Sequence, residues 1–465
     1  MDRINRRRFL KCAAAGGFAY AFGRTPQAVQ AATFSSAAAF DDYKALVCVF
    51  LFGGNDSFNM VVPRSNAEYA AYAASRQNLA VAQSALLPLT PLLADPQGAL
   101  YGLHPSMSAA AQLFEQDEVC AIVANAGPLL QPTTKAQFQA QSVRLPPQLF
   151  SHNDQQDQWH SLKGEAAARS GWGGRIADAL TRPGAPEPLA QDLAVNLSLS
   201  GQTLFQTGAT AVPYTMGATG PVSLFGLEGS DALTIGRRTA FQNLLSASYP
   251  TVYERAYARV QQRALAAAGR INTELATVRA PNPVPFVTAF PTSPLGAQLK
   301  TVAELIAVRD RLQVSRQIFF VATGGFDTHD AQVADQPGLL GNISACLAAF
   351  YRATVELGVA GSVTSFTQSD FGRTLTSNGD GTDHAWGGNQ LVVGAAVAGR
   401  TIYGRYPLLQ IDGPDDVGGG RMIPGISSDQ FAATLAKWFG VADADLGTVA
   451  PHLGNFAQRD LGFMT

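Results

Sequence analysis

Four loops of this sequence place acidic residues or histidines directly after an apolar run. Carboxylates combined with neutral imidazoles suit zinc, manganese or iron better than magnesium. In an open parallel sheet the carboxyl ends of the strands line one crevice, so we expect these loops to converge on one metal site. The residues concerned are Asp56 in GGNDS, Asp327 and His329 in GGFDTHD, Asp370 and Arg373 in SDFGR, and Asp383 and His384 in GTDHAWGG.

Residue spacing within the loops separates stronger ligand candidates from weaker ones. Asp327 and His329 are two residues apart, so in an extended chain their side chains point to the same face. Asp383 and His384 are adjacent and point apart, which makes His384 the better ligand and leaves Asp383 to orient an imidazole from behind. Each loop alone also fits a turn or a helix cap, because Gly, Asn, Asp and Ser favour both. The four loops together favour a metal site.

A fifth polar stretch, LFSHNDQQDQW at residues 149–159, has two open interpretations. Ser151 is a candidate nucleophile and His152 a candidate site residue, since backbone N–H groups at a helix start can hold an anion. Alternatively, Ser151 or Asn153 only caps a Gln-rich helix. Thr133 and Thr134 are weaker candidates for the nucleophile. The remaining histidines show no partner pattern: His104 and His160 are expected to be structural, and His452 is given no role.

Short apolar strands separated by helices must position these loops. Continuous apolar runs are expected of parallel strands that are buried on both faces. The runs lie at residues 45–52, 119–127, 317–325 and 362–369, and helical patterns lie at 337–358 and 427–440. This alternation predicts an α/β fold with a mostly parallel central sheet flanked by helices.

The domain organisation predicted from this pattern is one elaborated α/β domain over residues 32–465. A chain of 465 residues is long enough for two or three domains, but large α/β enzymes also form one. Residues 237–279 are rich in Ala, Arg and Gln, and a proline-rich stretch follows them. We therefore expect a helical insertion near residues 237–295 instead of additional sheet.

The N-terminus has the composition of an export signal. Arg6 and Arg7 precede Phe9, Leu10 and Lys11, a short apolar run follows, and AVQAA provides a small-residue cleavage zone. This order is typical of a twin-arginine signal peptide, here residues 1–31, and predicts a periplasmic or secreted protein that uses the twin-arginine export machinery. The apolar run is too short to span a bilayer comfortably, so we expect no stable membrane span after cleavage.

Charge and cysteine content exclude some classes of function. The chain holds 33 basic and 35 acidic residues, which gives no sign of nucleic-acid binding. Residues 1–31 hold six basic residues and one acidic residue, so their removal changes the net charge from −2 to −7 and disfavours an anionic membrane surface. Cys48 and Cys120 lie in apolar runs and are expected to be buried; a disulfide between them requires adjacent strands.

The ordered motifs resemble the twin-arginine-exported family called domain of unknown function 1501, which is grouped with the alkaline phosphatase and sulfatase-like superfamily. The motifs are FLFGGNDSFNMVVP, LFSHNDQQDQW, GWGGRIADAL, GGFDTHDAQ, SDFGRTLTSNGDGTDHAWGG and ATLAKWFG, between residues 45 and 440. The resemblance implies an alkaline phosphatase-like fold with a hydrolytic site for one or two divalent ions, zinc or manganese. It also implies ligand roles for Asp56, Asp327, His329, Asp370 and His384.

One position departs from the superfamily pattern. Where the superfamily commonly has Asp-His-Gly, this chain has Asp370-Phe371-Gly372, and phenylalanine cannot bind a metal. We therefore expect the second ion to be weakly held or absent. Arg373 can act as a fixed cation that binds an anionic oxygen. The sequence contains no sulfatase-like Cys-x-Pro-x-Arg motif, which disfavours a standard sulfatase.

Three hypotheses of function follow. The first is an exported metal-dependent hydrolase of a phosphate or sulfate ester, with Ser151, His152 and Arg373 as catalytic residues; without Ser151 as nucleophile, water activated at the metal attacks. The second is a catalytically degenerate protein that binds an anionic ligand, a glycan or an envelope partner, which Phe371 favours. The third is a structural component of an envelope assembly, whose signature would be an exposed apolar patch.

Overall fold

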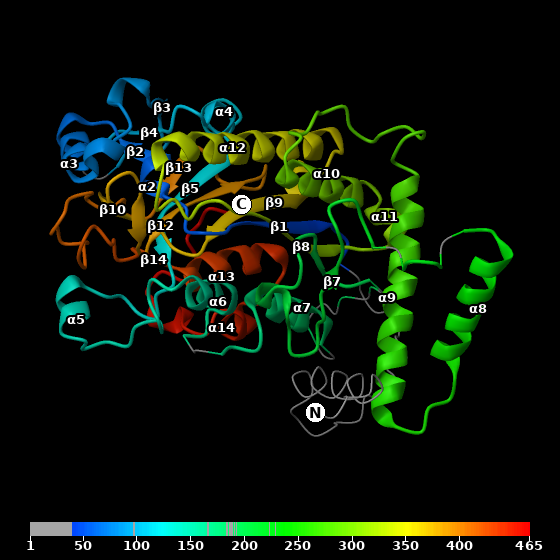
Figure 1. The fold of residues 1–465 in the computed structure, drawn as a ribbon. Coiled ribbons are helices and arrows are strands. Elements are labelled where there is room, and N and C mark those ends of the chain that lie inside the picture. The colour runs from blue at the N-terminus through cyan, green and yellow to red at the C-terminus, as the bar shows by residue number, and fades with distance from the viewer. Residues whose placement is uncertain are drawn as a thin grey trace, which may run out of the picture. The chain divides into compact units, whose positions relative to one another are not determined.

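A central mixed β-sheet organises the computed structural model, which describes residues 40–465 except 96–97, 165–166, 183–184, 186–188, 190, 192, 223 and 228 (Figure 1). The predicted signal peptide at residues 1–31 lies outside the described residues. Strand order in the sheet is β13-β5-β12-β9-β1-β8-β6-β7, with β14 paired to β5. The strands are β1 (Lys44–Leu51), β5 (Cys120–Gly127), β6 (Asn196–Ser198), β7 (Tyr214–Thr215), β8 (Arg316–Thr323), β9 (Val363–Ser369), β12 (Gly388–Val393), β13 (Thr401–Tyr403) and β14 (Ile426–Ser427).

The prediction of an α/β fold with a mostly parallel sheet and flanking helices is confirmed. The four apolar runs form β1, β5, β8 and β9. Strand β12 is the antiparallel exception, since it pairs antiparallel with both β5 and β9. Between β9 and β12 the chain forms no crossover helix, so it re-enters the sheet beside β9 in the opposite direction.

Two small sheets stand apart from the central one. Strands β10 (Arg373–Ser377) and β11 (Thr382–His384), which lie between β9 and β12 in the sequence, form an antiparallel pair. Strands β2 (Val61–Pro63), β3 (Leu87–Leu89) and β4 (Tyr101–Leu103) form a three-stranded antiparallel sheet. The pair β10 and β11 is the one that carries site residues.

Helices cover both faces of the central sheet (Figure 1). On one face are α4 (Ser108–Glu115), α10 (Pro294–Ala307) and α12 (Gln332–Glu356). On the other are α6 (His152–Ser161), α7 (Trp172–Thr181), α13 (Ser428–Phe439) and α14 (Leu446–Val449). Four further helices are α2 (Ser57–Met60), α3 (Asn66–Arg76), α5 (Lys135–Gln139) and α11 (Arg309–Leu312).

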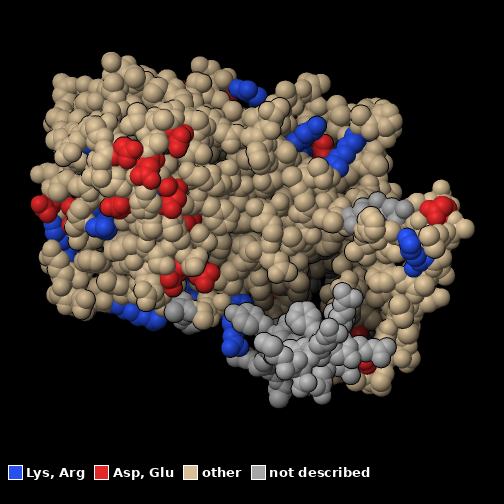
Figure 2. Space-filling model, in the orientation of Figure 1, with Lys and Arg blue, Asp and Glu red and all other residues tan. Residues whose placement is uncertain are grey.

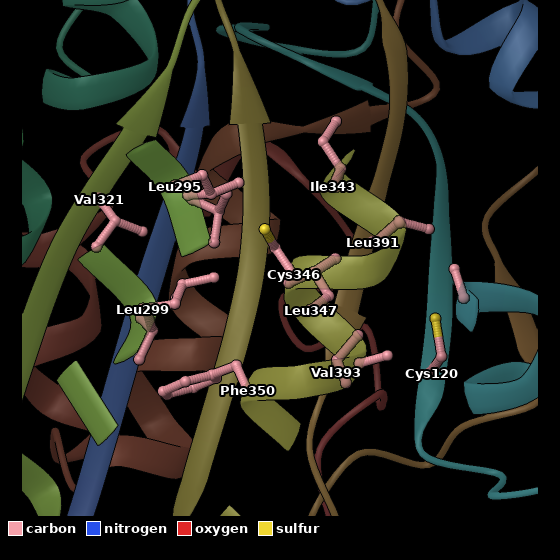
Figure 3. Packing of buried hydrophobic residues seen from close by; sticks show 14 of the residues in the cluster. Cys120, Leu295, Leu299, Val321, Ile343, Cys346, Leu347, Phe350, Leu391 and Val393 are labelled. Atoms are coloured by element: carbon pink, nitrogen blue, oxygen red, sulfur yellow. The ribbon is translucent and has the colours of Figure 1, made fainter. Parts of the chain in front are cut away.

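Alternate residues of β1 belong to two different apolar cores. Val47 and Val49 join the cluster that includes Leu347 of α12, whereas Cys48 and Phe50 join the cluster of α13 and α7. Figure 3 shows part of the first cluster, where side chains of α12 and α10 meet those of β8 and β12. Burial on both faces explains why β1 is apolar at every position instead of at alternate positions.

Helices α8 (Ala232–Ser246) and α9 (Val252–Ala276) form the hairpin seen beside the sheet in Figure 1. Ile271 and Leu275, near the end of α9, are buried in the core. Most of α8 is exposed, including Leu233 and Leu244. No helix in the described part of the chain combines the length and the apolarity that crossing a membrane requires.

The three described cysteines are buried free thiols. Cys48 is on β1 and Cys120 is on β5, and the strands β9 and β12 lie between them in the sheet. The two cysteines therefore act as small apolar core residues.

Candidate metal centre

The carboxylate of Asp327 lies at the centre of a group of three imidazoles. Its Oδ1 is 3.1 Å from His329 Nε2 and 3.3 Å from His384 Nε2, and its Oδ2 is 3.4 Å from His152 Nε2. His329 Nε2 and His384 Nε2 are 2.8 Å apart. Ligand atoms of His152, Asp327 and His384 all lie within 4.8 Å of one another. Residues from three separate parts of the sequence thus converge on one point.

Each of the three imidazoles directs its Nδ1 toward a hydrogen-bond acceptor. The pairs are His152 with Asp370 Oδ2 at 2.7 Å, His329 with Asp383 Oδ1 at 3.2 Å, and His384 with the carbonyl oxygen of Phe150 at 2.8 Å. A carbonyl oxygen only accepts, so Nδ1 of His384 donates and the neutral ring presents a bare lone pair at Nε2. Metal-binding histidines in proteins have this arrangement, with the second nitrogen bound to a carboxylate or a carbonyl.

The spacing of these donor atoms fits one small divalent ion. Zinc bonds of about 2.0–2.1 Å in a tetrahedron separate the ligand atoms by roughly 3.3 Å. The Asp327 carboxylate lies 3.1 to 3.4 Å from the three Nε2 atoms, those of His329 and His384 are 2.8 Å apart, and ligand atoms of His152, Asp327 and His384 lie within 4.8 Å of one another. Three imidazole nitrogens and one carboxylate are also ligand types that zinc and manganese accept. The residues present therefore fit a single ion.

Loops at the carboxyl ends of the sheet strands bring the cluster together. Asp327 and His329 follow β8, and His384 ends β11. His152 is the first residue of α6, on another part of the chain. Gly53, which follows β1 with φ +115°, has no room for a side chain, because a Cβ there would lie 2.3 Å from the backbone nitrogen of Asp327. Gly53, the first glycine in GGNDS, thus allows the loop after β8 to approach the loop after β1.

Arg373 is fully buried beside the cluster, opposite His384 in the β10–β11 register. Its Nη1 donates to Asp327 Oδ1 at 2.9 Å, and its Nε donates to Thr382 Oγ1 at 3.3 Å. Its Nη2 has no hydrogen-bond partner among the described residues. Burial lowers the pKa of Arg373, and its ion pair with Asp327 opposes that change. A buried guanidinium with an unused donor is suited to an anionic ligand.

Electrostatics keep the central ligands in the form that binds a metal. Burial alone would raise the pKa of Asp327, but the charges of Arg373, His152 and His329 lower it below its usual value. Burial lowers the pKa of His384, and the hydrogen bond to the Phe150 carbonyl opposes this. An ionised carboxylate and a neutral imidazole are therefore favoured at neutral pH.

Asp370 reaches the site through His152. Its carboxylate is fully buried, and Oδ2 accepts hydrogen bonds from His152 Nδ1, Gln156 Nε2 and the backbone N–H of Gly53. Burial raises the pKa of Asp370, against the lowering effect of the bonds from Gln156 and His152. Asp370, which the family resemblance implies to be a metal ligand, therefore supports the ligand His152 in this structure. Its Oδ1 has no hydrogen-bond partner among the described residues.

Asp56 is held behind the site by other residues. One carboxylate oxygen pairs with buried Arg76, and the other accepts from Gln332 Nε2. Gln332 Oε1 in turn accepts a 2.6 Å hydrogen bond from Thr382, which also bonds Arg373. The structure does not bring Asp56 into the imidazole group but connects it to that group by a chain of buried polar contacts.

Ser151 lies next to the cluster in sequence, but its hydroxyl is already engaged. Its Oγ donates to Asp154 Oδ2 at 2.6 Å, and it precedes the first residue of α6. Of the weaker candidates, Thr134 forms a capping box with Gln137 at the start of α5. His160 packs against phenylalanine rings, and burial lowers its pKa to about 3, as expected of a structural histidine.

Sequence reasoning did not identify three residues that contact the site. Gln156 binds Asp370 from one helical turn beyond His152, and the i, i+4 spacing on α6 was the available signal. The Phe150 carbonyl binds His384 through its backbone, so its side chain carried no signal. For Phe371 the sequence indicates only that a metal ligand is missing, and it does not predict that the ring contacts two of the histidines.

Negative charge gathers on the surface around the site. Figure 2 shows acidic side chains concentrated on the left part of the face in view, over the region of β10 and the start of α12. Asp327 and Asp330 before α12, Asp380 between β10 and β11, and Asp383 on β11 are exposed. Such a surface raises the local concentration of cations, a divalent ion included.

Comparison with known proteins places the chain in a family but does not supply an activity. No curated protein matches it. A family model described as protein of unknown function (DUF1501) matches residues 43–448, which include all the residues of the cluster. The chain therefore belongs to the DUF1501 family of proteins of unknown function.

Proposed function

We propose that this protein is an exported, metal-dependent hydrolase of a phosphate or sulfate ester, with an alkaline phosphatase-like fold and one divalent ion, zinc or manganese. The observation that carries the proposal is the arrangement of His152, His329 and His384. Each offers Nε2 to the Asp327 carboxylate while its Nδ1 is bound to an acceptor. This geometry suits a cation, because His384 in its tautomer presents a lone pair at Nε2 and the Nε2 atoms of His152 and His329 converge on the same carboxylate.

The residues of the site have distinct roles in this proposal. Asp327 and the three histidines hold the ion, which when bound supplies Lewis-acid polarisation of an ester oxygen. Arg373 binds an anionic oxygen of the substrate and stabilises charge that develops in the transition state. Asp370 holds the ring of His152. The attacking group is water or Ser151, whose hydroxyl must first leave Asp154.

The proposed substrate is a small anionic ester or a glycan that carries one. The exposed aspartates around the site disfavour an anion while the metal is absent, whereas a divalent ion together with Arg373 makes the centre positive. The twin-arginine motif around Arg6 and Arg7 supports a periplasmic or secreted location and use of the twin-arginine machinery.

A second candidate function is binding without turnover, at the same site. Two observations favour it: Phe371 occupies a position that offers no ligand, and Asp56 is committed to Arg76. These features leave ligands for one ion instead of two. A panel of phosphate and sulfate esters separates the two functions. Hydrolysis that stops when a chelator is added would exclude binding without turnover.

The metal centre itself is tested by metal content. The mature protein is purified and its zinc and manganese are measured by mass spectrometry, alongside Asp327→Ala and His384→Ala. We expect about one ion per chain in the parent protein and a metal content lower by roughly tenfold in both variants. Asp330→Ala, an exposed aspartate in the same loop, is the matched control and should retain the ion. Unchanged metal content in both Asp327→Ala and His384→Ala would contradict the proposed metal centre.

A further inference from the structure

Phe371 packs against the candidate metal ligands. Its ring centroid is 4.9 Å from that of His152 and 4.6 Å from that of His384, at interplanar angles of 39° and 31°. The rings of His152 and His384 are themselves 4.3 Å apart. Phe371 is only 3% exposed. One phenyl ring therefore contacts two imidazoles that belong to distant parts of the sequence.

Phe371 is buried but lies outside the three apolar clusters of the described residues. Buried phenylalanines usually join an apolar cluster, but Phe371 belongs to none of the three clusters found among the described residues. The aromatic rings that it contacts among the described residues are those of the two histidines. Its packing partners therefore include the candidate ligands themselves.

The loop after β1 is shaped to receive this ring. Gly54 has φ +85°, and a Cβ at this position would lie 2.3 Å from Cε2 and 2.4 Å from Cδ2 of Phe371. Atoms cannot approach so closely, so any side chain here displaces the phenyl ring. The second glycine of GGNDS thus makes room for Phe371, as the first makes room for the Asp327 loop.

We infer that Phe371 is a positioning residue that fixes the ring planes of His152 and His384, an inference that rests on the proposed metal centre. The hydrogen bond at Nδ1 holds one point of each imidazole but leaves the ring free to tilt about that bond. A flat apolar surface against the ring face removes this freedom, so that Nε2 stays directed at Asp327. Sites held in this way bind their ligand with less loss of conformational entropy.

The test replaces Phe371 with leucine, which keeps the position apolar but removes the flat ring face. Cobalt(II) is titrated into the metal-free protein, and its visible absorption reports both affinity and coordination geometry. For Phe371→Leu we expect about tenfold weaker binding, as for other residues that orient metal ligands, together with a shifted spectrum. Phe114→Leu is the matched control: Phe114 is fully buried on α4, in the apolar core, and its loss should lower stability without changing the cobalt spectrum.

Gly54→Ala provides an independent route to the same effect. Its methyl group displaces the phenyl ring, so cobalt affinity should fall as it does in Phe371→Leu. In the double variant the two losses should not add, because the ring that the methyl group displaces is already gone. Alanine is strained at φ +85°, so thermal unfolding is measured in parallel, and affinities are compared at a temperature where every variant is folded.

The outcomes separate this inference from the proposed function. If the parent protein binds no cobalt, the metal centre and the inference fall together. If the parent binds cobalt and Phe371→Leu binds it with equal affinity and an unchanged spectrum, the metal centre stands and the positioning role is overturned. The positioning role is supported if Phe371→Leu binds cobalt more weakly and with a shifted spectrum, while Phe114→Leu keeps the affinity and the spectrum of the parent protein.

Discussion

At the scale of single residues, the hydrogen bond made by one imidazole nitrogen decides what the other can do. His152 directs Nδ1 to Asp370 and Nε2 to Asp327, so it presents its lone pair toward the candidate ion only while Asp370 accepts the Nδ1 hydrogen. Asp370 is therefore as important to the site as a direct ligand would be, although it acts through its neighbour.

Asp370→Asn is expected to weaken zinc binding by about 10- to 100-fold, because the amide is a poorer acceptor for His152. The fold should not lose stability, since the substitution removes a fully buried carboxylate whose pKa burial has raised. Isothermal titration with zinc gives the affinity, and thermal unfolding gives the stability. Asp157→Asn, the same change on α6, is the control. Equal zinc affinity in the two variants would show that Asp370 does not orient His152.

At the scale of elements, the start of α13 contains a titrating carboxyl group unrelated to the metal cluster. Asp429 is buried there, and Oδ1 accepts a 2.8 Å hydrogen bond from the backbone N–H of His452. Burial raises the pKa of Asp429 to about 7, against the lowering effects of that bond and of Arg175. The folded protein therefore holds this proton more tightly than the unfolded chain does.

This shift predicts a stability that falls as pH rises. The contribution of Asp429 is complete below the ordinary carboxyl pKa and disappears as pH rises toward about 7. Between pH 5 and 7 the free energy of unfolding should fall by up to about 1.4 kcal/mol per pH unit from this group. Asp429→Asn should flatten that slope, measured by urea unfolding at both pH values. Asp443→Asn, an exposed aspartate nearby, should keep the parent slope; a parent-like slope in Asp429→Asn contradicts the assignment.

At the scale of the whole molecule, one buried ion pair joins segments that are far apart in the fold. Arg76, at the end of α3, pairs with Asp56 after β1 and donates through Nη1 to the carbonyl oxygen of Thr374 on β10 at 2.9 Å. Both side chains are almost completely buried. The pair therefore holds the β1 loop and the small sheet of the site in one arrangement.

Arg76→Leu is expected to lower the free energy of unfolding by about 3–5 kcal/mol, because it leaves the Asp56 charge buried without a cationic partner. Denaturant unfolding measures this loss. Lys437→Leu removes one partner of an exposed pair with Asp460 and should cost much less, because solvent screens that pair. Similar losses in the two variants would mean that the buried pair has no special role in the fold.

Much of the architecture was predictable because it depends on neighbouring residues. Continuous apolar runs indicated β1, β5, β8 and β9, and the predicted helix at the C-terminal end of the domain begins after the cap Ser427 and ends at Gly440. The helix predicted from residue 337 begins earlier, at Gln332, because Pro337 is accommodated inside its second turn. The reversed direction of β12 was not predictable, since it depends on how β10 and β11 return the chain to the sheet.

The site divides in the same way. Residue types and loop positions were sufficient to propose Asp327, His329 and His384 as site residues, since acids and histidines that follow strands are a local pattern, whereas His152 stayed one of two open interpretations of its stretch. Which atoms meet was decided by contacts between residues more than 200 positions apart, such as His152 with Asp370. Those contacts assign Asp370 to a histidine, commit Asp56 to Arg76 and place Phe371 against two rings. Turn and strand propensities depend on neighbouring residues, whereas burial and hydrogen-bond partners depend on packing in three dimensions. Only the tertiary structure therefore decided which residues are candidate metal ligands and which ones hold those ligands in place.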